Sequence, residues 1–151
     1  AEIIFFKRML QHVLPAQMRK HITKHLFEAY VNISEQEFCN SLYMSLDDIG
    51  VLQSEGMYIG SHTYNRFWLN SLSFAEQEIE IDRSLAFLNK IGAPTENWIM
   101  CYPFGGYNQD TLNILSARNC LAGLTTKVGA AHLSSDNAFE LSRFDTNDFP
   151  Q

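Results

Sequence analysis

From residue 57 onward, short apolar segments alternate with amphipathic helical segments, and this alternation constrains the fold more than any other feature. Strands are expected at 57–61, 98–102 and 121–126, where apolar residues are bounded by glycine, proline or polar turns. Helices are expected over 73–91 and 109–119, between these strands. Because strands that are joined by helices lie parallel in one sheet, the sequence predicts an α/β fold.

The N-terminal part shows helical periodicity and no strand pattern. Helices are expected over 3–14, 16–31 and 34–42, the first ending before a proline and the last beginning with a Ser-x-x-Glu capping box. We therefore predict a helical segment over 1–45, followed by an α/β domain over 46–151.

Composition excludes several classes of protein. With 46% hydrophobic and 19% charged residues, the chain has the composition of a folded globular protein rather than a disordered one. No apolar run approaches the roughly 18 residues that cross a bilayer. The formal net charge of −6 argues against nucleic acid as a partner. The chain opens at Ala1 without a methionine, so we expect it to be a piece of a longer protein and draw nothing from the lack of a targeting segment.

Three cysteines, Cys39, Cys101 and Cys120, form an odd and widely spaced set. No Cys-x-x-Cys pair is present, so neither a disulfide framework nor a zinc-finger site is expected. Free thiols predict a cytoplasmic location.

A histidine follows the first expected strand. Ligands bind at the carboxyl ends of strands in α/β sheets, and His62 comes directly after Gly60-Ser61 at such an end. Imidazole is a neutral metal ligand or a proton carrier near pH 7. The alternative interpretation is a structural or surface histidine.

The second expected strand ends in Tyr102-Pro103-Phe104-Gly105. Proline fixes the backbone here, and glycine lets the chain approach a ligand closely. A turn that needs these residues for its geometry alone would explain the glycine and the proline. It explains the two aromatic rings less well, since rings that flank a turn are typical of a wall on which a sugar stacks.

In this order, the motifs resemble the polysaccharide deacetylase family, also called the NodB-homology domain or carbohydrate esterase family 4. The resemblance rests on Gly60-Ser-His-Thr63, the run 68–73 with the acidic helix after it, Tyr102–Asn108, Gly123–Thr126 and Leu141–Asp145, and runs from about Ser45 to Pro150. It implies that the chain forms a portion of a distorted (β/α) barrel. It also implies hydrolysis of an N- or O-acetyl group of a carbohydrate, assisted by a divalent metal such as zinc. The implied partner is an acetylated sugar or polysaccharide precursor.

The chain departs from the family pattern at several positions. The strand end of the Thr-Phe-Asp-Asp-Gly type, whose Asp-Asp pair supplies the family's base and a metal ligand, is absent from these 151 residues. Arg66 stands where the second histidine ligand is expected, and a guanidinium cannot bind a cation. Cys101 stands where the family has an arginine. The resemblance thus carries over only His62 as a metal ligand and 102–105 as a substrate-binding wall, and Arg66 argues against a metal held by this chain alone.

Two explanations stay open at this point. The chain is either part of a longer deacetylase, or a homologue that has lost catalysis and keeps a carbohydrate-binding or scaffold role, which Arg66 favours. Cys101 as a nucleophile beside His62, and Asp145 as a replacement carboxylate, are further candidates. The simpler interpretations are a buried thiol and a solvated turn. We predict that the chain alone has no deacetylase activity, and the sequence gives no indication of an oligomeric state.

Overall fold

The computed structural model describes residues 2–149. The chain divides between Asp47 and Asp48 into two compact units, which are described separately below. Among the described residues, no helix is both long enough and apolar enough to span a bilayer.

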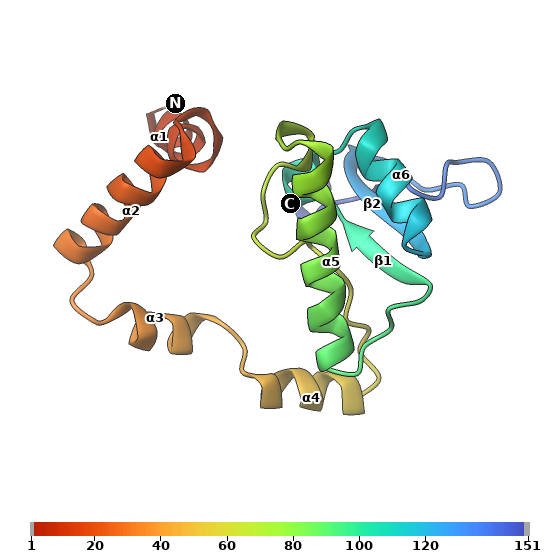
Figure 1. Ribbon diagram of the computed structural model, residues 1–151, viewed down its shortest axis with the longest axis horizontal. Coiled ribbons are helices and arrows are strands. Elements are labelled where there is room, and N and C mark those ends of the chain that lie inside the picture. The colour runs from red at the N-terminus through yellow and green to blue at the C-terminus, as the bar shows by residue number, and fades with distance from the viewer. Residues whose placement is uncertain (1, 150–151) are drawn as a thin grey trace. The chain divides into compact units, whose positions relative to one another are not determined.

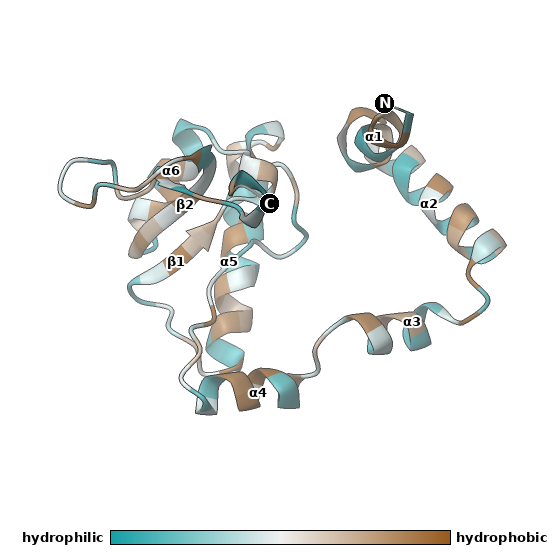
Figure 2. Cartoon of the chain, turned by 180° about the vertical axis from the view of Figure 1, so that it is seen from behind, coloured by the Kyte–Doolittle hydropathy of each residue, from teal (hydrophilic) through white to brown (hydrophobic). Residues whose placement is uncertain are grey.

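The first unit is helical. Its elements are α1 (Glu2–Arg8), a π-helical turn η1 (Met9–Val13), α2 (Ala16–Tyr30) and α3 (Glu35–Leu42). The helix expected over 3–14 therefore changes its hydrogen-bonding pattern part-way. Phe27 of α2 and Phe38 of α3 meet edge to face, with ring centroids 5.4 Å apart. Neither α1 nor α3 contains a buried residue, and hydrophobic and hydrophilic residues alternate along α2 and α3 in Figure 2.

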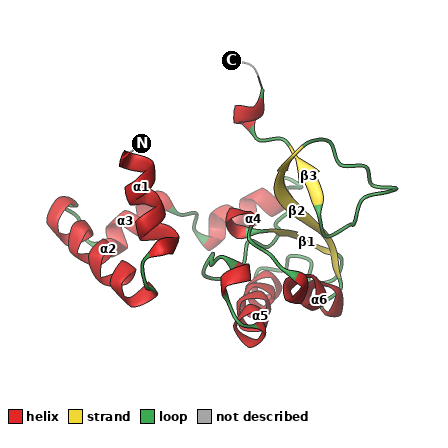
Figure 3. Cartoon of the chain, turned by 90° about the horizontal axis from the view of Figure 1, so that it is seen from above, coloured by secondary structure: helices red, strands yellow, loops and turns green. Residues whose placement is uncertain are grey.

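The second unit is an α/β domain. Its longer elements are α4 (Leu46–Ser54, starting at the boundary), α5 (Phe74–Lys90), β1 (Trp98–Cys101), α6 (Gln109–Ala117) and β2 (Cys120–Val128), which Figure 1 labels. The shorter ones are η2 (Leu69–Ser71), η3 (Pro103–Gly105), β3 (Leu141–Arg143) and η4 (Thr146–Asp148). The three strands form a parallel sheet in the order β1-β2-β3. Helices α5 and α6 lie on one face of this sheet (Figure 3). The predicted α/β fold is confirmed.

The core lies between the sheet and these two helices. Side chains alternate across a strand, so Trp98 and Met100 point to the helical face, where both are fully buried. They pack with Ile81 of α5 and Leu115 of α6. Burying side chains of this size stabilises the fold by about 1.5–3 kcal/mol each. The indole of Trp98 also donates a 2.8 Å hydrogen bond to the Arg118 carbonyl, at the end of α6.

The strand expected at 57–61 is wrong in all but its last residue. Only Ser61 bridges to Met100 of β1, in the parallel sense. The amide of Ile99, which a neighbouring strand would pair, donates instead to the Tyr58 hydroxyl at 2.9 Å. This side chain replaces the backbone carbonyl of a strand, so no ladder forms before Ser61. The residue after Ser61 nevertheless lies beside the end of β1, as the sequence predicted.

Candidate functional site at the carboxyl ends of the strands

His62 follows the bridge residue Ser61 and lies against the end of β1. Its Nδ1 lies 2.7 Å from the carbonyl oxygen of Cys101. A carbonyl only accepts hydrogen bonds, so Nδ1 carries the proton and Nε2 keeps its lone pair. Burial lowers the pKa of His62. The Cys101 hydrogen bond opposes this, and the positive charges of Arg66 and Arg143 lower the pKa further. The imidazole is therefore neutral near pH 7.

The turn after His62 is held by α5. Asn65 donates its backbone amide and its side-chain amide to the two carboxylate oxygens of Glu80, at 2.7 and 2.5 Å. Glu80 is buried, so its carboxylate depends on these two donors. The Arg66 amide donates to the Thr63 hydroxyl at 3.1 Å, and both of these residues have positive φ. The turn fixes the backbone of Arg66 and leaves its side chain exposed.

The residues predicted as a substrate wall are divided between the core and the surface. Tyr102 and Pro103 are buried, and the Tyr102 hydroxyl donates to the Phe139 carbonyl at 2.7 Å. Phe104 is 38% exposed and stacks on Trp68, with ring centroids 5.2 Å apart and planes 9° from parallel. The exposed side chain of the predicted wall is therefore Phe104, whose ring packs against Trp68.

Gly105 brings this turn against β2. Its φ is +73°, and a Cβ at this position would overlap the Thr126 hydroxyl. Only glycine satisfies both the left-handed backbone and the close approach. The sequence left a ligand contact and turn geometry open for this glycine, and in the structure its close neighbour is Thr126.

Arg143 ends β3 on the same edge of the sheet. Its Nε donates to the Thr125 carbonyl of β2 at 2.8 Å. Sequence reasoning gave no role to Arg143 or to Trp68. The signal for Arg143 was available, because Arg143 lies in the motif Leu141–Asp145, one of those that carry the family resemblance. The Trp68–Phe104 stack joins residues far apart in sequence and left no such signal.

Cys101 and Asp145 are the two remaining candidates, and neither forms a reactive pair with His62 by a hydrogen bond among the described residues. The ring of His62 is hydrogen-bonded to the backbone of Cys101, and no hydrogen bond joins it to the thiol among the described residues. Asp145 accepts from the backbone amide of Asn147 at 3.0 Å and from its side-chain amide at 2.7 Å, and these bonds lower the pKa of the Asp145 carboxyl. Asp145 thus begins the turn η4, which fits the interpretation of a solvated turn. All three cysteines are free thiols.

Comparison with known proteins assigns the chain to a family. The model of the polysaccharide deacetylase family matches residues 8–121, which is more than half of the chain. The chain belongs to the polysaccharide deacetylase family. The match begins at Arg8, the last residue of α1, earlier than the resemblance from about residue 45 that the motifs indicated.

Individual relatives support this assignment. The chain is 31% identical over 90 residues to YxkH of Bacillus subtilis (strain 168), whose name places it among the polysaccharide deacetylases; the alignment covers 59% of this chain and 32% of YxkH. It matches the structure of the Streptococcus pyogenes deacetylase PplD in complex with acetate with a TM-score of 0.64 and 29% identity, covering 71% of this chain and 46% of that one.

A third comparison concerns the fold alone. The BpsB deacetylase domain from Bordetella bronchiseptica matches with a TM-score of 0.54 and 15% identity, over 67% of this chain and 48% of that domain. The α/β unit therefore corresponds to part of the barrel in these deacetylases. The chain spans about a third of YxkH and less than half of the PplD and BpsB chains.

A divalent metal does not fit the residues that this polysaccharide deacetylase family member presents. The family is typically metal-dependent, yet no group of three or more histidine, cysteine, aspartate or glutamate side chains is suitably placed within residues 2–149. His62 is accompanied by Arg66 and Arg143, whose charges repel a cation. One ligand with two guanidinium groups nearby does not make a metal site.

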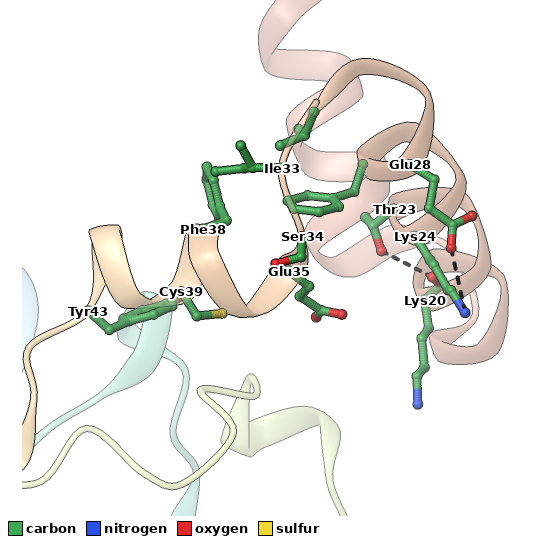
Figure 4. A pocket seen from close by; sticks show the side chains of 12 residues that line it. Lys20, Thr23, Lys24, Glu28, Ile33, Ser34, Glu35, Phe38, Cys39 and Tyr43 are labelled. Atoms are coloured by element: carbon green, nitrogen blue, oxygen red, sulfur yellow. Dashed lines mark hydrogen bonds and ion pairs between the residues drawn. The ribbon is translucent and has the colours of Figure 1, made fainter.

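A hollow of about 630 Å³ lies between α2 and α3 in the first unit (Figure 4). Its lining includes Phe38 and Tyr43, with Lys20 at one side. Lys24 is paired with Glu28 at 3.7 Å. The hollow brings together no set of residues with recognisable chemistry, so the candidate site remains the strand-end edge.

Proposed function

We propose that the protein carrying this chain binds an acetylated carbohydrate at the carboxyl edge of its sheet and hydrolyses the acetyl group. The observation that carries the proposal is the exposed ring of Phe104, which lies in the turn after β1 and stacks on Trp68. The C–H face of a sugar ring packs well on such an aromatic surface. His62, at the end of the neighbouring segment, would then face the substituents of that sugar.

The chemistry of His62 supports a role in hydrolysis. Its neutral Nε2 can accept a proton from a water molecule as that water attacks the acetyl carbonyl. The C–N or C–O bond to the sugar then breaks, the proton passes to the leaving nitrogen or oxygen, and acetate is released.

A divalent metal such as zinc, as the family suggests, would need ligands beyond His62 that residues 2–149 do not bring together. No step above depends on it. A second candidate function follows from Arg66, whose presence at the family's ligand position favours a homologue that binds carbohydrate without hydrolysing it.

One experiment separates these functions. Binding of N-acetylated and O-acetylated oligosaccharides to the complete protein is measured by calorimetry, and acetate release is measured in parallel. Phe104→Ala should abolish binding, whereas Phe87→Ala, which removes a ring of similar exposure (39%) from α5, should not. Acetate release that is lost in His62→Gln supports the hydrolase. Binding without acetate release supports the second candidate, and no binding to any acetylated sugar overturns both.

A further inference from the structure

Cationic side chains gather at the carboxyl edge of the sheet, although the chain as a whole carries a net charge of −6. Arg66 lies in the turn after His62, Lys127 lies near the end of β2, and Arg143 ends β3. All three are exposed. Val128 is paired with Arg143, so the ends of β2 and β3 adjoin directly. A positive edge on an acidic protein indicates a ligand of opposite charge.

Arg143 is held in place by the sheet. Its Nε donates to the carbonyl of Thr125, a buried residue whose own hydroxyl donates to the Leu141 carbonyl at 3.0 Å. Ordering the guanidinium through Nε reduces the entropy that binding an anion would otherwise cost. The arginine is therefore preorganised, in contrast to a freely moving surface side chain.

Two carboxylates near this edge accept hydrogen bonds from neutral amides. Asp145 accepts from the amides of Asn147, and Glu80 accepts from those of Asn65. Within residues 2–149, the ion pairs formed by lysine and arginine involve Lys24 and Arg118 and leave the cations of this edge unpaired. Asp145 keeps its negative charge and acts electrostatically on Arg143, so a ligand would compete with Asp145 at Arg143, whereas Arg66 forms no ion pair among the described residues.

The aromatic surface lies beside this charge. Gly105, next to Phe104, approaches Thr126, and the preceding residue Thr125 holds Arg143. A molecule that stacks on Phe104 therefore has a guanidinium on the neighbouring strand segment. The effect of Arg66 and Arg143 on the pKa of His62 agrees with a positive potential at this edge.

We propose that this edge selects an acetylated carbohydrate that also carries a carboxylate, such as a uronic acid, with Arg66 and Arg143 as the partners of the carboxylate. The planar guanidinium matches a carboxylate in geometry and charge. The positive charge that excludes a metal from this chain becomes the feature that recognises the substrate. This inference rests on the proposed function, since it names the class of carbohydrate bound at that same site.

The test compares two ligands that differ only in charge. Hyaluronan tetrasaccharide, which contains N-acetylglucosamine and glucuronate, and the same tetrasaccharide with its carboxyl groups reduced to alcohols are titrated into the complete protein by calorimetry. We expect the acidic sugar to bind about tenfold more tightly, with a preference that falls as salt is raised. Arg66→Gln and Arg143→Gln should each lose most of this preference and keep the affinity for the neutral sugar.

Lys90→Gln removes a charge at the far end of α5 and should retain the preference. Arg66→Gln is the decisive variant, because this side chain is exposed and its loss leaves the fold intact. Equal affinity for the two sugars, or an unchanged preference in Arg66→Gln, would overturn the inference and leave the proposed function standing. If neither tetrasaccharide binds and no neutral acetylated sugar binds, the proposed function is refuted.

Discussion

Arg66 shows how one residue sets the character of the strand-end edge. The position lies four residues after His62, where the family resemblance calls for a second imidazole, and a neutral ligand there would favour a cation. A guanidinium reverses the sign of the local potential and lowers the pKa of His62. Arg143 adds to this effect from the end of β3.

Removing the charge of Arg66 should raise the pKa of His62. In Arg66→Gln, the repulsion between the guanidinium and the protonated imidazole is lost, so protonation becomes easier. The pKa is measured by following the His62 ring resonances by NMR as a function of pH. Lys90→Gln serves as the control and should leave the titration unchanged. A His62 pKa that stays the same in Arg66→Gln would show that burial alone sets it.

Gly105 should be far less tolerant of a side chain than Gly92. Both have positive φ, of +73° and +69°, but a Cβ at Gly105 overlaps Thr126, whereas nothing lies within 4 Å of a Cβ at Gly92. We expect Gly92→Ala to cost about 1 kcal/mol of unfolding free energy and Gly105→Ala about 2–4 kcal/mol. Urea denaturation measures both. Equal losses would contradict the close packing of Gly105 on β2.

At the level of elements, α5 positions the turn that carries His62 and Arg66. Glu80 binds Asn65, and the Ser84 and Ser61 hydroxyls lie 2.6 Å apart. The same helix also packs on the sheet, through Ile81 in the core. A helix on the back of the sheet thus fixes the geometry at its edge.

Glu80→Ala should therefore affect both stability and carbohydrate binding. It leaves the two amide donors of Asn65 without their acceptor, which costs about 1–3 kcal/mol, and it frees the turn. Denaturation and sugar titration measure the two effects. Glu78→Ala on the same helix breaks a partly exposed ion pair with Arg118, which keeps its bond to Asp82, and should cost about 1 kcal/mol or less without changing binding. Loss of binding in both variants would show that α5 acts through its overall stability.

The elements differ in how far the sequence could predict them. The strands at 98–101 and 120–128 are apolar segments with clear boundaries, so local pattern located them. The prediction of a strand at 57–61 was wrong because the Ile99 amide donates its hydrogen bond to the Tyr58 hydroxyl, a contact between residues 41 apart in sequence. The stack of Phe104 on Trp68 depends on a similarly distant pairing. Local pattern therefore placed the edge of the sheet but not the contacts that assemble the site.

Over the whole molecule, the fold and the distribution of charge together determine which kind of ligand the strand ends suit. The family resemblance led us to expect a divalent metal, but the described residues bring no three ligands together, while cations collect at the strand ends. The cationic side chains at the strand ends are suited to attract an anionic ligand to this edge. Binding at this edge should therefore depend on salt, and folding should depend on the protonation of His62.

The stability of the protein should fall as pH is lowered, through His62. The pKa of His62 in the folded protein is below the ordinary 6.5 that the unfolded chain retains. As pH falls through 6.5, the unfolded chain takes up a proton that the folded protein resists, so folding becomes less favourable until the folded-state pKa is also passed. Thermal unfolding of the wild type and His62→Gln, measured from pH 8 to about pH 5, should show the wild type losing stability relative to the variant on acidification. The exposed His132→Gln should follow the wild type. A constant difference between wild type and His62→Gln across this range would contradict the lowered pKa.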